Sequence, residues 1–375
     1  MSSQALNPTT AFPIPGTGMG GCKTLPVFDA SVLQQQDSIP AEYQWPEDPN
    51  TFLSVSALCK DEWLDIPTID LSAFMAGDSA TVLDIVKEAC TEHGFFQVIN
   101  HDVPPELVKA AHQHMQLFFG LNLQEKQRAQ RKVGESFGFS SSFTGRFASK
   151  LPWKETLSLE YSAPSGVKDY LEMIMGYHFS ETGVVYQKYA EAMESLSLNI
   201  LELLGVSLGM ERTYFRKFFE ESKSILRLNY YPPCRQPSRT FGTGPHCDPT
   251  SLTILHQDQV GGLEVFVHNT WLSVRPNPNA FVCNIGDTFM ALSNGKYKSC
   301  LHRAMVNPHM ARRSLTFFLN PSYDKLICPP QQLLDQPRKY RDFTWLQFLE
   351  FTQKHYRSDS NTLASFIEWL GSHQS

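Results

Sequence analysis

The stretch from residue 225 to residue 320 most constrains the fold, because short apolar runs are divided there by Pro, Gly and Asn. The runs alternate apolar and polar residues and contain many β-branched and aromatic side chains, as half-buried strands do. Expected strands cover residues 225–231, 252–255, 263–267, 271–274, 280–285, 301–306 and 315–319. Evenly spaced strands with such turns predict an α+β protein, with a jelly roll (double-stranded β-helix) core flanked by helices.

Three potential metal ligands lie in this stretch. His246 and Asp248 stand two positions apart, and His302 follows far downstream. In extended backbone, side chains two apart leave the same side of the strand, so His246 and Asp248 can hold one ion. Two imidazoles and one carboxylate are the ligand set of non-haem Fe(II) oxygenases, which leaves one face of the metal open. A lone H-x-D is a weak signal, but with His302 it predicts a metal site at the open end of the jelly roll.

The strand-like segment that begins at Arg312 and leads into residues 315–319 places Arg312 and Ser314 on one face and Arg313 on the other. A guanidinium beside a hydroxyl suits the far carboxylate of a dicarboxylic acid, because the fork donates two parallel charge-assisted hydrogen bonds. Asn229 and Tyr231 share a side of an earlier strand in the same way. Taken alone, an arginine here is more often a solvated surface charge. Together these four residues favour a site that binds a dicarboxylic acid. In such a site the side chain of Arg312 would face into the barrel.

The chain resembles the plant Fe(II)- and 2-oxoglutarate-dependent dioxygenases in NYYPPC at residues 229–234, in the three metal ligands, and in Arg312 with Ser314. It is similar, more narrowly, to the gibberellin 20-oxidases. That similarity rests on LPWKET at residues 151–156 and on residues 39–46, 142–147, 246–258 and 284–295. The resemblance implies Fe(II) at the metal site, 2-oxoglutarate and O2 as cosubstrates, and ascorbate as reductant. It also implies that Arg312 and Ser314 hold 2-oxoglutarate, with Tyr231 and Asn229 nearby.

The resemblance implies stepwise oxidation of carbon-20 of gibberellin precursors, from methyl to alcohol to aldehyde and then loss of the carbon, in gibberellin biosynthesis. Such a substrate is a rigid diterpenoid carboxylate, whose pocket needs apolar walls and one or two cations. Lys154, in the LPWKET run, and Arg146 are the candidate cations. The alternative for Lys154 is a surface cluster with Glu155, which would have little energetic weight. Departures from the family pattern at residues 307–322 leave the preferred precursor open.

Three alternatives remain. A related dioxygenase would act on another gibberellin position or on a flavonoid, and the LPWKET run argues against it. A zinc hydrolase could use the same three ligands, but it would have no use for Arg312 and Ser314. A catalytically inactive, hormone-binding barrel would not need the metal ligands and the arginine that this chain retains.

Composition predicts a cytoplasmic enzyme. A net charge of −6 among 375 residues argues against nucleic acid as a partner. The N-terminus shows no basic start followed by an apolar run, and no stretch reaches the roughly twenty apolar residues of a membrane span. The eight cysteines show no C-x-x-C spacing, which favours free thiols in a reducing compartment. The oligomeric state is open.

Along the chain we expect a poorly ordered segment (1–38), a helix-rich region packing on the barrel (39–224), the jelly-roll core (225–320) and C-terminal helices of the same unit (321–375). Helical spacing of apolar residues predicts helices after residue 81, after residue 105 and from residue 185 toward 209, and again at 345–356 and 363–370. His112 and His114 point to different sides of a helix and are expected to be structural or on the surface. His256 is expected to be a satisfied strand histidine.

Overall fold

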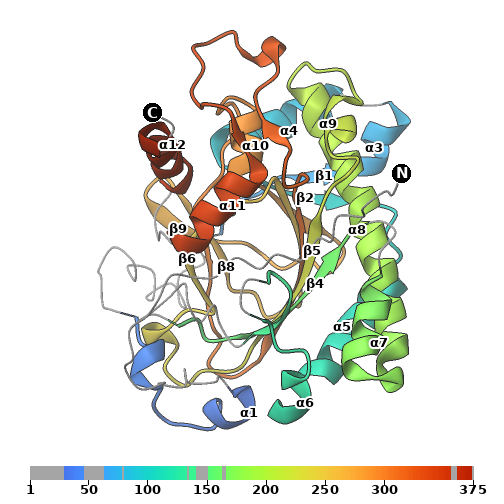
Figure 1. The fold of residues 1–375 in the computed structure, drawn as a ribbon, viewed down its shortest axis with the longest axis vertical. Helices are drawn as coiled ribbons and strands as arrows, with labels where there is room; N and C mark the ends of the chain where they lie inside the picture. Colours follow the sequence, from blue (N-terminus) through green and yellow to red (C-terminus); the bar gives the residue numbers. More distant parts are fainter. Residues whose placement is uncertain are drawn as a thin grey trace, which may run out of the picture.

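The computed structural model describes residues 29–45, 63–77, 80–132, 135–140, 151–162, 166–355 and 361–373. Two sheets form the centre of the molecule, with α8 along one side of the large sheet and α11 and α12 on the other side (Figure 1). The large sheet has the order β1-β2-β10-β7-β12-β5-β4-β3, and the small sheet has the order β6-β11-β8-β9. This is the expected α+β jelly roll with flanking helices.

The strands of the large sheet come from both halves of the chain. They are β1 (Thr68–Asp70), β2 (Phe95–Ile99), β3 (Gly138–Ser140), β4 (Glu155–Tyr161), β5 (Ser224–Tyr231), β7 (Leu252–Gln257), β10 (Phe281–Ile285) and β12 (Arg312–Leu319). The small sheet contains β6 (Thr243–His246), β8 (Leu263–Val267), β9 (Thr270–Ser273) and β11 (His302–Ala304), and a separate hairpin pairs β13 (Leu326–Ile327) with β14 (Phe343–Thr344). Each strand expected between residues 225 and 320 is present, but the large sheet also takes four strands from before residue 224.

The helices are α1 (Ala30–Leu33), α3 (Leu71–Ala76), α4 (Ala80–Glu92), α5 (Pro105–Phe119), α6 (Leu123–Gln127), α7 (Val167–Met175), α8 (Ser180–Ser207), α9 (Tyr214–Phe218), α10 (Asp287–Leu292), α11 (Trp345–Lys354) and α12 (Thr362–His373). Short 3-10 helices are η1 (Ala41–Tyr43), η3 (Tyr177–Phe179), η4 (Pro237–Arg239) and η5 (Gln331–Leu333). The five helices expected from periodicity match α4, α5, α8, α11 and α12. Among the described residues, no helix has the length and apolar character to cross a bilayer.

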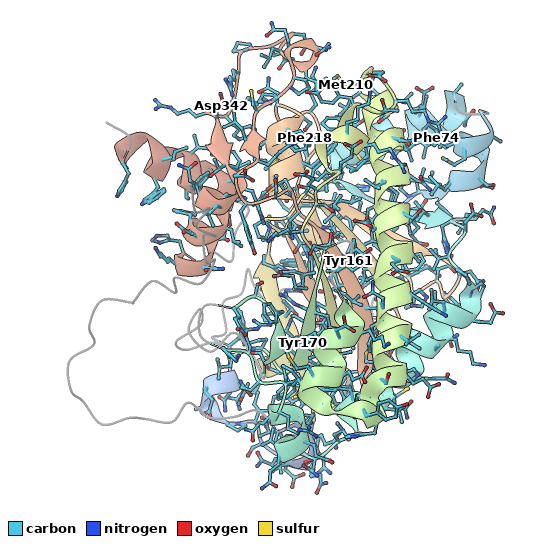
Figure 2. All side chains as sticks on the ribbon, turned by 45° about the vertical axis from the view of Figure 1, so that its right-hand side comes forward. Phe74, Tyr161, Tyr170, Met210, Phe218 and Asp342 are labelled. Atoms are coloured by element: carbon cyan, nitrogen blue, oxygen red, sulfur yellow. The ribbon has the colours of Figure 1, made fainter. Side chains whose placement is uncertain are left out.

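The two faces of the large sheet have different surroundings, as β12 shows. Leu315, Phe317 and Leu319 are fully buried in the main apolar core, which also takes in the buried side of α8. Figure 2 shows the side chains packed between sheet and helix, where Tyr161 donates a 3.0 Å hydrogen bond to Glu194 of α8. The alternate residues of β12 face the other way, into a cavity. The period-two alternation of a strand therefore separates the core from the cavity.

Residues 30–38 fall in the segment expected to be poorly ordered, but part of that segment packs on the barrel. The helix α1 buries Ala30 and Leu33, and the Ala30 amide donates to Glu155 at 3.2 Å. The side chain of Asp29 accepts from the Ser31 amide and so begins the helix. Ordered structure thus begins before residue 38, and residues 1–28 lie outside the described part.

His112 and His114 of α5 each make a hydrogen bond within the fold, which agrees with a structural role. His112 Nε2 lies 2.8 Å from Nδ1 of His256, whose Nε2 donates to the carbonyl of Pro278 at 3.1 Å. His114 bonds instead to Thr182 at 2.9 Å. The prediction that His256 is a satisfied strand histidine is confirmed. The described cysteines Cys90, Cys234, Cys247, Cys283, Cys300 and Cys328 are free thiols.

Candidate active site

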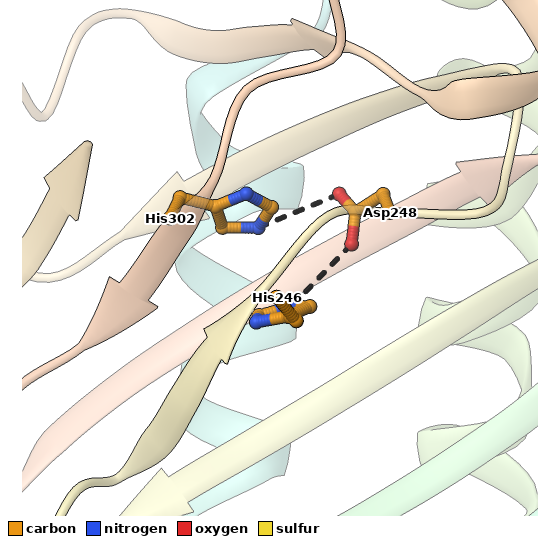
Figure 3. A group of neighbouring side chains, drawn as sticks. All are labelled: His246, Asp248 and His302. Carbon is orange, nitrogen blue, oxygen red and sulfur yellow. Dashed lines mark ion pairs between the residues drawn. The ribbon is translucent and has the colours of Figure 1, made fainter. Parts of the chain in front are cut away.

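The three expected metal ligands meet at one end of the small sheet. His246 ends β6, His302 begins β11, and the two residues are paired opposite each other across the antiparallel ladder. Nε2 of His246 lies 3.5 Å from Oδ1 of Asp248, and Nε2 of His302 lies 3.6 Å from Oδ2 of the same carboxylate. Figure 3 shows both imidazoles turned toward Asp248. One potential ligand atom from each residue lies within 4.8 Å of the others, so the set can hold one metal ion.

Backbone carbonyls fix the orientation of both imidazoles. Nδ1 of His246 lies 2.9 Å from the carbonyl of Gly244, and Nδ1 of His302 lies 3.1 Å from the carbonyl of Cys300. A carbonyl can only accept, so each Nδ1 carries the proton and each Nε2 lone pair is left for the metal. The carboxylate is held as well, because Oδ2 of Asp248 accepts from Thr253 Oγ1 at 2.7 Å and from Asn284 Nδ2 at 3.0 Å.

The protonation states also suit a metal. Burial raises the pKa of Asp248, but the charges of His302 and His246 and the hydrogen bonds from His246 and Asn284 outweigh it and hold that pKa below its ordinary value. Burial lowers the pKa of His302 to about 4. At neutral pH the set is therefore one carboxylate with a neutral His302, as metal binding requires.

The residues expected to hold 2-oxoglutarate lie together on the cavity face of β5 and β12. Arg312 is paired with Tyr231, and Ser314 with Asn229. Asn229 Nδ2 donates to Ser314 Oγ at 3.2 Å, and the Arg312 guanidinium lies 4.9 Å from the centroid of the Tyr231 ring. All four side chains line one cavity of about 490 Å³. The four residues therefore lie where one ligand could reach them all, and their contact with 2-oxoglutarate stays a prediction.

Orphaned polar atoms in this part of the cavity fit a dicarboxylate. Arg312 donates from Nη2 to Gln257 at 2.9 Å, but its buried Nε has no hydrogen-bond partner in the described part of the chain. The same holds for Nε2 of Gln257 and Oδ1 of Asn229. Buried donors without partners are costly, and a carboxylate beside Arg312 would satisfy the Nε donor.

Arg313 lies on the opposite face. Its guanidinium stacks 5.6 Å from the Tyr230 ring centroid, and its amide donates to Asp258. Arg313 does not line the cavity that holds Arg312. The expected strand register is thus confirmed.

Lys154 is buried in the cavity wall, with 4% of its surface exposed. It donates to Thr243 Oγ1 at 2.9 Å and lies 5.7 Å from the Tyr231 ring centroid. Glu155 points elsewhere, to a buried ion pair with Lys126 at 2.8 Å. The alternative of a Lys154 and Glu155 surface cluster is therefore wrong. Burial, with the charges of nearby arginines, lowers the pKa of Lys154. Arg146 lies outside the described residues.

Several residues of the cavity and its surroundings were not predicted from the sequence. Arg227 lies two positions before Asn229 on the same face of β5, so strand alternation could have found it. Thr253 and Asn284 hold Asp248 across the sheet, and only the register reveals them. Trp45 lines the cavity against Gly244, where a Cβ atom would stand 2.0 Å from the indole. The absence of a side chain at Gly244 thus allows the N-terminal segment to close one wall.

Comparison with known proteins gives the class of this fold and site. The profile of the 2OG-Fe(II) oxygenase superfamily matches residues 222–321, and that of the N-terminal region of non-haem dioxygenases in morphine synthesis matches residues 66–177. A crystal structure described as JOX2 in complex with 2OG, Fe and JA superposes with a TM-score of 0.77 at 32% identity, covering 92% of this chain and 98% of that one. The chain belongs to the 2OG-Fe(II) oxygenase superfamily and is an Fe(II)- and 2-oxoglutarate-dependent oxidoreductase.

Within that superfamily the chain is similar to gibberellin 20 oxidases over nearly its whole length. It is 56% identical to gibberellin 20 oxidase 1 of Arabidopsis thaliana over 95% of both chains. It is 54% identical to gibberellin 20 oxidase 1-B of Triticum aestivum, over 92% of this chain and 95% of that one. The resemblance noted in the sequence is confirmed.

Proposed function

We propose that this chain oxidises carbon-20 of gibberellin precursors stepwise, from methyl to alcohol to aldehyde and then with loss of the carbon. One observation carries the proposal. The metal set of His246, Asp248 and His302 opens onto the same cavity as Arg312 and Ser314, and this cavity has apolar and cationic walls. The similarity to gibberellin 20 oxidases supports carbon-20 as the position oxidised.

The protein's own residues bind and orient the reactants. When bound, iron supplies the centre at which O2 and 2-oxoglutarate react, giving succinate, carbon dioxide and an oxidised substrate, with ascorbate keeping the metal reduced. Arg312 and Ser314 donate to the distal carboxylate of 2-oxoglutarate, with Tyr231 and Asn229 beside them. The cavity would hold the target carbon near the metal, and the bound substrate would displace water from it, which favours the productive geometry and limits side reactions.

The substrate we propose is a diterpenoid carboxylate. The apolar side chains of Leu255, Phe318 and Leu349 line the cavity and suit a rigid hydrocarbon skeleton, and Lys154 adds a cation to the cavity wall. The free thiols of the described cysteines support a reducing compartment, and we place the enzyme in the cytosol.

The test is product analysis by mass spectrometry after incubation with gibberellin precursors, Fe(II), ascorbate and 2-oxoglutarate. We expect alcohol, aldehyde and carbon-20-depleted products with matched release of succinate. Oxidation at another position would assign the enzyme to the related dioxygenases. No conversion of any gibberellin precursor, or conversion without release of succinate, would contradict the proposal.

A further inference from the structure

Two arginines meet at one buried hydroxyl on the cavity side of β5 and β4. Arg131 Nη2 and Arg227 Nε each donate to Oγ of Ser158 at 3.0 Å, and Ser158 is 0% exposed. Both arginines line the same cavity as the metal ligands. We propose that Arg131 and Arg227, joined at Ser158, form a subsite for the substrate carboxylate that is separate from Arg312. The inference deepens the proposed function and rests on it.

The position of the pair suits a substrate that spans the cavity. In the paired register, Leu255 of β7, Thr316 of β12, Arg227 of β5 and Ser158 of β4 lie opposite one another. Asp248 is held over β7 by Thr253. Neighbouring strands are about 4.8 Å apart, so the backbone of Arg227 lies roughly 10 Å from that of β7. A rigid polycyclic acid can therefore place one carbon at the metal while its carboxylate reaches the arginine pair.

The two carboxylate sites lie on different parts of the same strands. Arg312 is paired with Tyr231 at one end of the β5 and β12 ladder, and Arg227 is paired with Thr316 four positions along β5 from Tyr231. Four positions on a strand correspond to about 13 Å. One bound 2-oxoglutarate at Arg312 therefore leaves the Arg227 region for a second anion.

The charge of the cavity wall also favours a second anion. Among the described lining residues, the cations are Arg131, Lys132, Lys154, Arg227, Arg303 and Arg312, and the acids are Glu135 and Asp248. Arg303 is compensated by a 2.6 Å ion pair with Glu264, and Asp248 serves the metal. The wall therefore carries more cations than acids, which favours an anion in the cavity.

The local structure holds both guanidiniums in place. The amide of Arg131 donates to the carbonyl of Phe139 at 2.8 Å, beside Gly138, whose φ is +104°. A Cβ atom at Gly138 would stand 2.8 Å from Cα of Arg131, so only glycine lets these chains approach. Arg227 stacks 5.1 Å from the ring centroid of Phe318 while its Nε is bound to Ser158. Burial lowers the pKa of Arg131 to about 10, which leaves it charged at neutral pH.

The experiment compares an acid with its neutral derivative. A gibberellin precursor and its fully esterified methyl ester are each titrated by calorimetry into anaerobic protein loaded with Fe(II) and 2-oxoglutarate. For the unaltered chain we expect the acid to bind about 30-fold more tightly than the ester or better, as a desolvated charge pair gives. In Arg227→Gln and Arg131→Gln we expect that preference to fall at least about 10-fold, with ester binding and 2-oxoglutarate binding unchanged within about threefold.

Controls separate recognition from folding. Arg216→Gln alters a half-exposed arginine on α9 that pairs with Glu202 outside the cavity, so it should keep the full preference. Arg227→Lys keeps the charge but loses the planar fork, so it should retain part of the preference. The 2-oxoglutarate affinity and circular dichroism report whether each variant is folded, and the Arg131 and Arg227 variants test the subsite independently.

The outcomes distinguish the inference from the function. Equal loss of acid and ester binding in both variants would show a structural role and overturn the inference, as would an unchanged preference. If the unaltered chain converts no gibberellin precursor but its preference for the acid depends on Arg131 and Arg227, the proposed function fails and the carboxylate subsite stands. If the unaltered chain shows no preference for the acid, the inference is wrong even where turnover is normal.

Discussion

The two faces of the large sheet are built from the same strands but do different work. On β12, Leu315, Phe317 and Leu319 enter the apolar core beside α8, whereas Arg312, Ser314 and Thr316 line the cavity. The core face gains stability by burying apolar area. The cavity face keeps buried polar atoms without partners, which costs stability in the ligand-free chain. Adjacent residues can therefore have opposite roles, and substitutions at neighbouring positions can test this division.

The largest effect is expected at the metal ligands. His246→Ala, Asp248→Ala or His302→Ala should each abolish turnover, because each removes one of three iron ligands while the apolar core is untouched. Bound iron and succinate release are the measurements, with His373→Ala on the exposed end of α12 as the control. Normal turnover in any of the three variants would refute the ligand assignment.

Substitutions on the core face of β12 should lower the stability of the fold rather than the affinity for ligands. Phe317→Ala should lower the free energy of unfolding by about 3–5 kcal/mol, because it leaves a cavity in a fully buried position. Phe318→Ala, on the cavity face, should cost roughly 1 kcal/mol, since its side chain is only partly buried. Denaturant unfolding compares the two variants, and a larger loss at Phe318 would reverse the proposed faces.

Arg312 and Arg313 give the matching comparison for binding. Arg312→Ala should weaken 2-oxoglutarate binding by roughly 2–5 kcal/mol, because the distal carboxylate loses its partner in a buried pocket. Arg313→Ala should change it by about 0.5 kcal/mol or less. Arg312→Lys should also weaken 2-oxoglutarate binding substantially, since an ammonium group cannot reproduce the two parallel hydrogen bonds of the guanidinium. The measurement is an anaerobic titration of 2-oxoglutarate into each iron-loaded variant. A greater loss of affinity in the Arg313 variant would mean that the strand register is shifted by one residue.

Lys154 should affect the organic substrate more than the cosubstrate. If Lys154 pairs with the substrate carboxylate, Lys154→Ala should weaken substrate use by about 2 kcal/mol. Its effect on 2-oxoglutarate affinity should be smaller. Substrate KM and 2-oxoglutarate Kd are measured together, with exposed Lys109→Ala as the control. A larger change in the 2-oxoglutarate Kd would move Lys154 to the cosubstrate end, where Tyr231 already lies close to it.

The smallest expected effect concerns pH and the histidine pair behind the cavity. Burial, then the charges of His256 and Arg313, lowers the pKa of His112 to about 3. A pKa depressed on folding means that stability is complete above the unfolded pKa of about 6.5 and is lost progressively as pH falls from there toward the folded pKa of about 3. Between pH 7.5 and 6, the unaltered chain should lose about 0.8 kcal/mol more than His112→Gln, which keeps a polar partner but does not titrate. Equal losses would show that His112 is not responsible.

The sequence predicted the parts of the fold that depend on local periodicity. The strands between residues 225 and 320, the long helices and the placement of Arg312 against Arg313 all follow from alternation and helical spacing. The strand β4 did not stand out because it begins at the charged residue Glu155, whose burial depends on a distant partner, Lys126. The short strand β6 (Thr243–His246) has no apolar alternation and exists through its pairing with β11.

The residues of the site also differ in whether the sequence alone could reveal them. His246, Asp248 and Arg312 could be found because residue type and spacing express the chemistry directly. Asn284 could not, since its contact with Asp248 depends on how β10 and β7 pair. Arg131 lies after the turn that follows α6, in a segment without a spacing signal, and Ser158 joins it to Arg227 only in the folded sheet. Contacts that depend on register between distant segments are those the sequence leaves open.

The most direct test of the division between faces is an anaerobic crystal structure of the chain loaded with Fe(II) and 2-oxoglutarate. The quantity to measure is the distance from the distal carboxylate of 2-oxoglutarate to each guanidinium. We expect hydrogen-bond distances of about 2.7–3.0 Å to Arg312 and Ser314, with iron bound by His246, Asp248 and His302. A carboxylate bound to Arg313, or to the Arg131 and Arg227 pair instead of Arg312, would contradict the account.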